Sequence, residues 1–443
     1  MSASSEFKLV FQISKLKDIY FSSVKYNSAI GIDRINSKVF EKNLDQNISI
    51  IRNKSQNMSY VFSQYREKLI SRGAHKIPRL ISIPTLRDKL TLKALFRILT
   101  SVYGDESPFL HNVVNEVNNT ILQKNFDCVL RLDVKDFYLS INHGLLQAQL
   151  SKRIKKKEII HLITNSISQQ TVNKGAGKNK ACNFVGIPQG LPISNVLANI
   201  YMLPIDKKYK KRSSLKYFRY VDDILIFCKK NRNQQIRNEI TKDCHNINLE
   251  LYGDDNPTKC HIGAVCSGFS YLGYEFKDPL VTVREKSLEN LRDSIIRTLT
   301  YYRYSEKSDT RLLMWTLNLR ITGCQFNRTK YGWLFYFSQI NDIKLLASLD
   351  HFVEKQLIRF GIDPNKIQAK KFVRTYYEIT RNLKDSKYIP NFDQNTPDEK
   401  REILRVVFGV DVEQLQDNQI EYRFRQKIFL SIRDLERDLS KHS

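Results

Sequence analysis

Apolar and polar positions between residues 218 and 227 predict a β-hairpin that carries two adjacent acids. The run reads Phe-Arg-Tyr-Val-Asp-Asp-Ile-Leu-Ile-Phe, so aromatic and β-branched residues flank Asp222 and Asp223 on both sides. Such a pattern is typical of two short strands joined by a turn. Side chains along a strand alternate between its faces, so the two carboxylates share a face only if the turn redirects one. Adjacent acids are also ordinary turn residues, so the hairpin alone leaves a structural turn and half of a divalent-metal site as alternatives.

A second alternating run, residues 129–138, predicts a strand that leads into a helix. Leu130, Leu132 and Val134 alternate with Arg131 and Asp133. An acid at the carboxyl end of a strand stands where α/β-type sheets place their chemistry. The alternative is a structural one, in which an aspartate at this junction caps the following helix.

The first part of the chain predicts mostly helix over residues 1–70, and a strand over 76–84 that carries Lys76 and Arg79. Thr85 and Asp88 then form a capping signal for a helix with an apolar face of leucines. Cations on a strand usually face solvent. The functional alternative is that they bind phosphate, which Arg can do in bidentate fashion.

Further along, residues 186–202 form a Gly/Pro-rich loop before an apolar helix, where Gln189 and Gly190 let the backbone approach a flat ligand.

Another acid pair, Asp254 and Asp255, follows a strand-like run. Pro257 argues against a returning strand, so we interpret this pair as part of a polar loop. Residues 271–276 predict a strand with a glycine at a close backbone approach.

From about residue 285 the apolar spacing becomes helical, and residues 385–400 predict a loop before a terminal helical segment. Tyrosines and cations interleave at 301–304 and near 331–336. Most of these aromatic side chains are expected in the core, and a few are candidates for stacking on bases.

Composition and charge narrow the function classes. The chain has 443 residues, of which 41% are hydrophobic, so two to four subdomains are expected rather than a disordered chain. Lys and Arg number 72 against 46 Asp and Glu, giving a net charge of +26. This balance favours a nucleic-acid partner over a membrane surface, and two basic runs, 152–157 and 207–212, are either solvated faces or parts of a groove for the phosphate backbone.

The seven cysteines include no Cys-x-x-Cys pair, which suits free thiols in a reducing compartment. The Cys and His residues between 244 and 266 match the spacing of no common zinc finger. No apolar run approaches the length of a membrane span, so we expect a soluble cytoplasmic protein with no membrane partner.

Four of these stretches, in this order, resemble the motifs of the reverse transcriptase family, and of its bacterial members in particular. They are residues 129–138, the Pro-Gln-Gly…Ser…Asn run in 186–199, Tyr-Val-Asp-Asp at 220–223 and Tyr-Leu-Gly-Tyr at 271–274. The resemblance spans roughly residues 30–350. It implies an α+β right-hand polymerase, with a palm whose antiparallel sheet packs on helices. The expected parts are an N-terminal region with fingers (1–128), a palm with an inserted fingers segment (129–280), a helical thumb (281–355) and a helical C-terminal extension (356–443).

The resemblance also implies roles for individual residues. Asp133, Asp222 and Asp223 resemble the catalytic carboxylates that hold two Mg²⁺ ions, with the Val134 carbonyl as a further metal ligand. The implied nucleotide-binding residues are Lys76 and Arg79 on the triphosphate, Tyr138 as steric gate below the sugar, Gln189 and Gly190 in the pocket, and Lys259. Tyr271, Leu272 and Gly273 resemble the primer grip.

The implied activity is that of a nucleotidyltransferase, an RNA-directed DNA polymerase whose partners are an RNA template, the DNA product and deoxynucleoside triphosphates. An oligomer is compatible with this assignment. The chain lacks the Asn-Ala-x-x-His and Val-Thr-Gly motifs of retron enzymes, and no RNase H, integrase or HNH-type segment is apparent after the thumb. It therefore looks more like the antiviral reverse transcriptases of phage defence, which imply a structured non-coding RNA as template. Two alternatives remain: a template-independent enzyme on the same palm, and an RNA-binding, maturase-like protein with a vestigial site.

Overall fold

The computed structural model describes residues 2–26, 29–71, 77–104, 110–173, 183–305 and 309–439. The chain divides into two compact units, one of residues 1–108 and 126–264, the other of residues 109–125 and 265–443. Both mix helices with mainly antiparallel sheets, which confirms the predicted α+β class. The finer division into four parts stays a prediction.

The first unit contains most of the described sheet structure. Its helices are α1 (Ala3–Val10), α2 (Ile13–Ile19), α3 (Ser37–Lys42), α4 (Leu44–Gln56), α5 (Leu86–Tyr103), α7 (Phe137–Ser140), α8 (His143–Leu150), α9 (Lys157–Ile167), α10 (Ser194–Lys210) and α11 (Asn233–His245), with a π-helical turn at Tyr20–Val24 and a 3-10 turn at Lys230–Arg232. Its strands are β1 (Tyr65–Ile70), β2 (Arg79–Ile83), β3 (Cys128–Asp133), β4 (Thr171–Val172), β5 (Lys216–Tyr220), β6 (Asp223–Cys228) and β7 (Cys260–Ala264).

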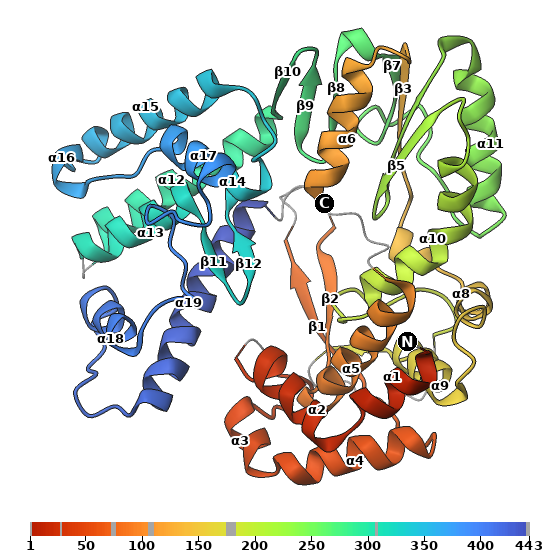
Figure 1. Cartoon of the computed structure of the whole chain (residues 1–443), viewed down its shortest axis with the longest axis horizontal. Helices are drawn as coiled ribbons and strands as arrows, with labels where there is room; N and C mark the ends of the chain where they lie inside the picture. The colour runs from red at the N-terminus through yellow and green to blue at the C-terminus, as the bar shows by residue number, and fades with distance from the viewer. Residues whose placement is uncertain are drawn as a thin grey trace. The chain divides into compact units, whose positions relative to one another are not determined.

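A four-stranded antiparallel sheet with the order β5-β6-β3-β7 lies at the centre of this unit. The predicted strand is confirmed as β3, but its burial does not alternate as expected: five of its six residues are buried, Asp133 among them, and only Arg131 is partly exposed. Helices α10 and α11 pack against this sheet (Figure 1). Their apolar side chains, such as Leu197 and Ile240, belong to the large core of the unit.

The second sheet of this unit corrects one prediction. Helix was expected over most of residues 1–70, but the helices end at Gln56 and Tyr65–Ile70 forms β1. This strand pairs antiparallel with β2 and parallel with β4. Its own residues are a weak signal for a strand, and pairing with distant segments decides its conformation. Thr85 does cap α5 as predicted, since its side chain accepts the N–H of Asp88.

The second unit is mostly helical. Its helices are α6 (Leu110–Leu122), α12 (Glu285–Tyr304), α13 (Thr310–Thr322), α14 (Trp333–Tyr336), α15 (Ile343–Arg359), α16 (Pro364–Ile367), α17 (Phe372–Arg381), α18 (Pro397–Val406) and α19 (Asp417–Leu439), with a 3-10 turn at Val265–Ser267. Its strands are β8 (Phe269–Tyr271), β9 (Tyr274–Lys277), β10 (Leu280–Val283), β11 (Cys324–Phe326) and β12 (Thr329–Tyr331). Helix α6 joins this unit across a long stretch of sequence, because the His111 Nε2 atom lies 2.7 Å from the carbonyl oxygen of Phe335.

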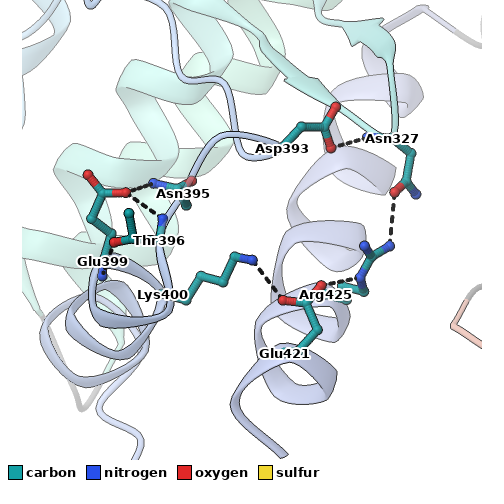
Figure 2. Close-up of polar contacts among 8 residues, drawn as sticks. All are labelled: Asn327, Asp393, Asn395, Thr396, Glu399, Lys400, Glu421 and Arg425. Carbon is teal, nitrogen blue, oxygen red and sulfur yellow. Dashed lines mark hydrogen bonds and ion pairs between the residues drawn. The ribbon is translucent and has the colours of Figure 1, made fainter. Parts of the chain in front are cut away.

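The loop predicted near residues 385–400 precedes the last helices and contacts the hairpin β11–β12 (Figure 2). The Asp393 carboxylate accepts the backbone N–H groups of Asn327 and Arg328, at 2.7 and 2.8 Å, in the tight turn of that hairpin. Arg425 of α19 donates to the Asn327 side chain at 2.9 Å. Beneath these contacts, an apolar cluster that includes Phe326, Phe392 and Phe424 gives the C-terminal helices a core of their own.

Candidate active site

The tight turn between β5 and β6 carries Asp222, as the sequence pattern predicted. Val221 and Asp222 form the turn, and Val221 adopts φ +57°, a left-handed conformation that costs a β-branched residue energy. The buried Arg219 guanidinium offsets this cost, since it donates to the Val221 carbonyl at 2.8 Å. Its other N–H groups bind the carboxylate of Asp206 on α10, with Nε to Oδ1 at 2.8 Å. The turn is therefore anchored to the helix below the sheet.

Strand β3 places Asp133 beside this turn. Asp133 is the register partner of Asp223 in the antiparallel β3–β6 pair. One residue further, the Val134 N–H donates to the Asp222 carbonyl at 3.2 Å. The structure thus brings three acids from distant parts of the sequence to the same end of the central sheet.

Two cations from the same sheet region bind two of these acids. Lys259 Nζ lies 2.7 Å from Asp133 Oδ2, and Arg131 Nη2 lies 2.9 Å from Asp223 Oδ2. Burial raises the pKa of Asp223, although the Arg131 guanidinium partly offsets this effect. Burial, reinforced by the nearby charge of Asp133, raises the pKa of Asp222 to about 6. The three carboxylates of the site therefore carry more negative charge than Lys259 and Arg131 neutralise.

This donor set suits a hard divalent cation, because it consists of carboxylate oxygens and a neighbouring backbone carbonyl. Burial, and then the charge of Asp133, raises the pKa of Asp222, and a bound cation would favour its ionised form. Within the described residues, no three carboxylate, imidazole or thiol groups converge on one point as metal ligands. Asp133 and Asp223 instead face Lys259 and Arg131, so holding an ion together requires these carboxylates to turn away from their cations.

Tyr138 lies beside the acids, at the end of the segment that follows β3. Its hydroxyl donates to the Asn195 side chain of α10 at 2.6 Å, which fixes the position of the ring. Burial, and then the charge of Asp222, raises the pKa of Tyr138, while Arg79 and Arg219 lower it. These charges place Arg79, the first residue of β2, within electrostatic reach of the same ring.

The loop with Gln189 and Gly190 is held between this tyrosine and β2. The Ile187 N–H donates to the Tyr138 carbonyl at 2.7 Å, and the Ser82 N–H donates to the Gln189 carbonyl at 2.7 Å. Gly190 adopts φ +99°, and a Cβ atom at this position would lie 2.7 Å from the Cγ2 atom of Ile81. Only glycine allows this close approach without displacing β2.

Two predicted groups are not among the described residues of the first unit. Lys76 lies outside the described residues. Tyr271, Leu272 and Gly273 lie in the second unit, where the single strand predicted over 271–276 is wrong. The chain turns back between β8 and β9, because Leu272 and Gly273 adopt φ +51° and +81°, which suits a two-residue hairpin turn rather than a strand. The Tyr336 hydroxyl donates to the Leu272 carbonyl at 3.2 Å and holds this turn.

Sequence reasoning missed four side chains that position the site: Arg131, Asn195, Asp206 and Arg219. Arg131 and Asn195 stood inside the recognised motifs, and Arg219 directly precedes one of them. Both arginines occupy strand positions where a cation interrupts apolar residues. A cation on a strand with two buried faces signals a buried acidic partner, and this signal identifies Arg219. Asn195 and Asp206 lie on a helix, and no local pattern separates them from ordinary polar residues.

Comparisons with known proteins give a family match, a curated relative and similar solved structures. Residues 71–276 match the family model described as "Reverse transcriptase (RNA-dependent DNA polymerase)". The "Putative COX1/OXI3 intron 1 protein" of Saccharomyces cerevisiae is 22% identical over 419 residues, which cover 73% of this chain and 49% of that protein. The chain thus spans about half the length of the curated relative that it matches.

Among solved structures, similarity is found to apo telomerase from Candida tropicalis. One such structure covers 95% of this chain and 82% of its own, with 14% identity and a TM-score of 0.43. Another, truncated from its C-terminal domain, covers 50% of this chain and 55% of its own, with 16% identity and a TM-score of 0.38. No helix in the described part of the chain combines the length and apolar character needed to span a membrane.

Proposed function

Residues 71–276 form a reverse transcriptase domain, the domain of an RNA-directed DNA polymerase, and on this premise we propose that the protein adds deoxynucleotides to a 3′ end on an RNA template. The observation that carries the proposal is the β3–β6 register, which sets Asp133 opposite Asp223 with Asp222 in the adjoining turn. Phosphoryl transfer needs alignment and charge stabilisation more than covalent chemistry from the protein. The three clustered acids can provide this alignment and charge stabilisation through bound metal ions.

The carboxylates of Asp133, Asp222 and Asp223, with the Val134 carbonyl, would hold the two Mg²⁺ ions. Bound magnesium supplies Lewis-acid stabilisation of the charge on the primer 3′-oxygen and on the leaving pyrophosphate. Lys259 and Arg131 bind two of these carboxylates in the structure, and these carboxylates would turn from the two cations to the metal ions when they bind.

The incoming nucleotide is assigned to the space beside Tyr138. Arg79 and Lys76 bind its triphosphate, and the close approach of Gly190 to β2 brings the strand that carries Arg79 toward the loop. The Tyr138 ring, held through Asn195, excludes a sugar that bears a 2′-hydroxyl. Gln189 lines the pocket, and the β8–β9 turn at Tyr271–Gly273 holds the primer.

The decisive experiment removes the acid pair of the turn. In the double variant Asp222→Ala/Asp223→Ala, we expect Mg²⁺-dependent primer extension to fall below detection, while the melting temperature and RNA binding persist. The matched control is Asp254→Ala/Asp255→Ala, which removes the other adjacent acid pair from an exposed loop and should leave extension unchanged. Extension that survives in the first variant would contradict the assignment.

The biological setting follows from the resemblance to bacterial phage-defence enzymes. In this proposal the template is a structured non-coding RNA and the role is antiviral. Sequencing the nucleic acid that copurifies with the protein tests it, since one enriched RNA and its complementary DNA are expected. A homopolymeric or random product would favour template-independent addition. Bound RNA without any DNA product, equal in wild type and acid variant, would favour an RNA-binding protein with a vestigial site.

A further inference from the structure

Helix α17 and the loop after it form a basic and aromatic face in the second unit, well beyond residues 71–276. Between residues 370 and 388 the chain contains six basic and two acidic residues. This face borders an open hollow of about 570 Å³, whose lining includes Asp350, Lys371, Arg374, Tyr377, Glu378 and Arg381. The hollow lies wholly within one unit.

Two arginines of this face lie over tyrosine rings. The guanidinium carbon of Arg374 is 4.3 Å from the ring centroid of Tyr388, and that of Arg381 is 4.8 Å from the ring centroid of Tyr377. Spacings of three and four residues put Arg374, Tyr377 and Arg381 in one row on the helix surface. The row is open to solvent, since the Arg374 side chain is 66% exposed.

The two acids of the hollow are already engaged. Asp350 accepts the N–H groups of Phe372 and Val373 at the start of α17, at 2.6 and 3.3 Å. Glu378 is mostly covered, with 16% of its side chain exposed, and accepts from Asn382 at 3.1 Å. Two cations of this face are also paired, Lys371 with Glu354 and Arg374 Nε with Glu378 Oε1 at 3.8 Å. The exposed groups of the row are the guanidinium groups of Arg374 and Arg381 and the ring of Tyr377.

We propose that this face binds single-stranded nucleic acid, with bases stacked on the Arg–Tyr pairs and phosphates bound by Arg374 and Arg381. Stacked aromatic and guanidinium planes beside cations are the features that bind single strands without sequence preference. Arg374 and Arg381 stand about 10 Å apart along the helix axis, so the row suits a strand of two or more nucleotides better than a mononucleotide. Neither stacking nor phosphate contact reads the 2′-hydroxyl, so RNA and DNA should bind alike.

The test uses the full-length protein and a 12-nucleotide oligouridine that contains photoreactive 4-thiouridine. Irradiation should cross-link it to the tryptic peptide of residues 375–381, which holds Tyr377. We expect Tyr377→Ala and Arg381→Ala to lower both the cross-link and the affinity about tenfold. In Arg381→Ala the cross-link is measured on residues 375–384, because trypsin no longer cleaves at position 381. Arg381→Lys, which keeps the charge but loses the plane, should fall between. Arg423→Ala, at an exposed position of α19, removes the same charge elsewhere in the unit and should change neither readout.

The binding measurement is repeated with the matching deoxyuridine oligomer, and we expect RNA and DNA to bind with similar affinity. Extension of a short preformed primer–template should stay unchanged in Tyr377→Ala, so this site and the proposed polymerase activity fail independently. Tyr377→Trp keeps an aromatic face and should preserve the cross-link, which guards against an effect of folding. Absence of the cross-link in the wild type, an equal loss in Arg423→Ala, or equal competition by an acidic peptide would overturn the proposal.

Discussion

At the scale of single residues, the three acids of the candidate site differ in how their charge is balanced. Asp133 and Asp223 each have a cation within 3 Å, in Lys259 and Arg131. Asp222 instead has a pKa raised to about 6 by burial and by the charge of Asp133. Its ionised form is therefore a local cost to the folded protein in the absence of metal.

This cost predicts a pH dependence of stability. In the folded state Asp222 binds its proton more tightly than at the ordinary pKa of 3.8, so stability falls as the pH rises from about 4 through about 6. In metal-free buffer at pH 7.5, Asp222→Asn should raise the free energy of unfolding by about 1–3 kcal/mol, and the gain should vanish near pH 4. Urea unfolding at several pH values measures it.

Asp255→Asn provides the control, because it makes the same change at an exposed loop position. Its difference from the wild type should stay flat across this pH range. A gain for Asp222→Asn that is no larger at pH 7.5 than at pH 4 would show that Asp222 is not the strained charge.

Tyr138 is the residue whose shape is expected to select the sugar. Tyr138→Val removes the ring, so the ratio of ribonucleotide to deoxynucleotide incorporation should rise about tenfold or more. Tyr138→Phe keeps the ring and loses only the hydrogen bond to Asn195, so its ratio should stay near that of the wild type. Single-nucleotide incorporation kinetics measure both, and an unchanged ratio in Tyr138→Val would exclude the ring as the gate.

At the scale of elements, the site depends on how closely the loop with Gly190 approaches β2. The Ser82 N–H bonds to the Gln189 carbonyl, and Gly190 leaves room for Ile81 of the same strand. This contact joins the strand that begins at Arg79 to the loop and to Tyr138. A shift of this strand by about 1 Å is enough to misplace reacting groups.

Gly190→Ala tests this arrangement. The added Cβ atom would lie 2.7 Å from Ile81, so β2 or the loop must move, and we expect the KM for deoxynucleotides to rise about ten- to hundredfold. Gly104→Ala is the control: Gly104 also has a positive φ, +69°, but no described atom lies within 4 Å of its Cβ position. Both changes should lower the melting temperature, and only the first should alter KM. If Gly190→Ala and the wild type have equal KM values, the contact between the loop and β2 does not contribute to nucleotide binding.

At the scale of the whole molecule, the dominant property is the net charge of +26. Basic residues occur in both units, so the attraction to a polyanion does not depend on one patch. Binding that neutralises phosphates releases condensed counterions, and its strength then depends on salt.

This charge predicts a steep loss of RNA affinity with salt. If the chain contacts six or more phosphates, affinity for a single-stranded RNA should fall about a hundredfold or more between about 50 and 200 mM salt. Fluorescence anisotropy over this range gives the slope. Arg381→Ala should reduce the slope of log affinity against log salt concentration by somewhat less than one unit. If the affinity of the wild type does not change with salt, the net charge does not serve RNA binding.

Elements with a local signal can be recognised from the order of the amino acids alone. Alternating apolar residues fixed β3 and the β5–β6 hairpin, and the apolar spacing of Leu288, Leu291 and Ile295 identified α12, whose inward side chains are buried. These patterns work because strand and helix periodicities depend only on neighbouring residues. The prediction of a single strand over 271–276 was wrong because it used only the local pattern of residues. Leu272 and Gly273 turn the chain through positive φ angles, which that pattern does not reveal.

Which distant residues meet becomes known only from the folded chain. The register that sets Asp133 opposite Asp223 joins segments about ninety residues apart, and the binding of Lys259 to Asp133 joins still more distant ones. The conformation of β1 likewise depends on its partners β2 and β4. Strand pairing and buried ion pairs are set by the packing of the whole unit, because their energies depend on non-local neighbours and on burial, and neither is encoded in a short window of sequence.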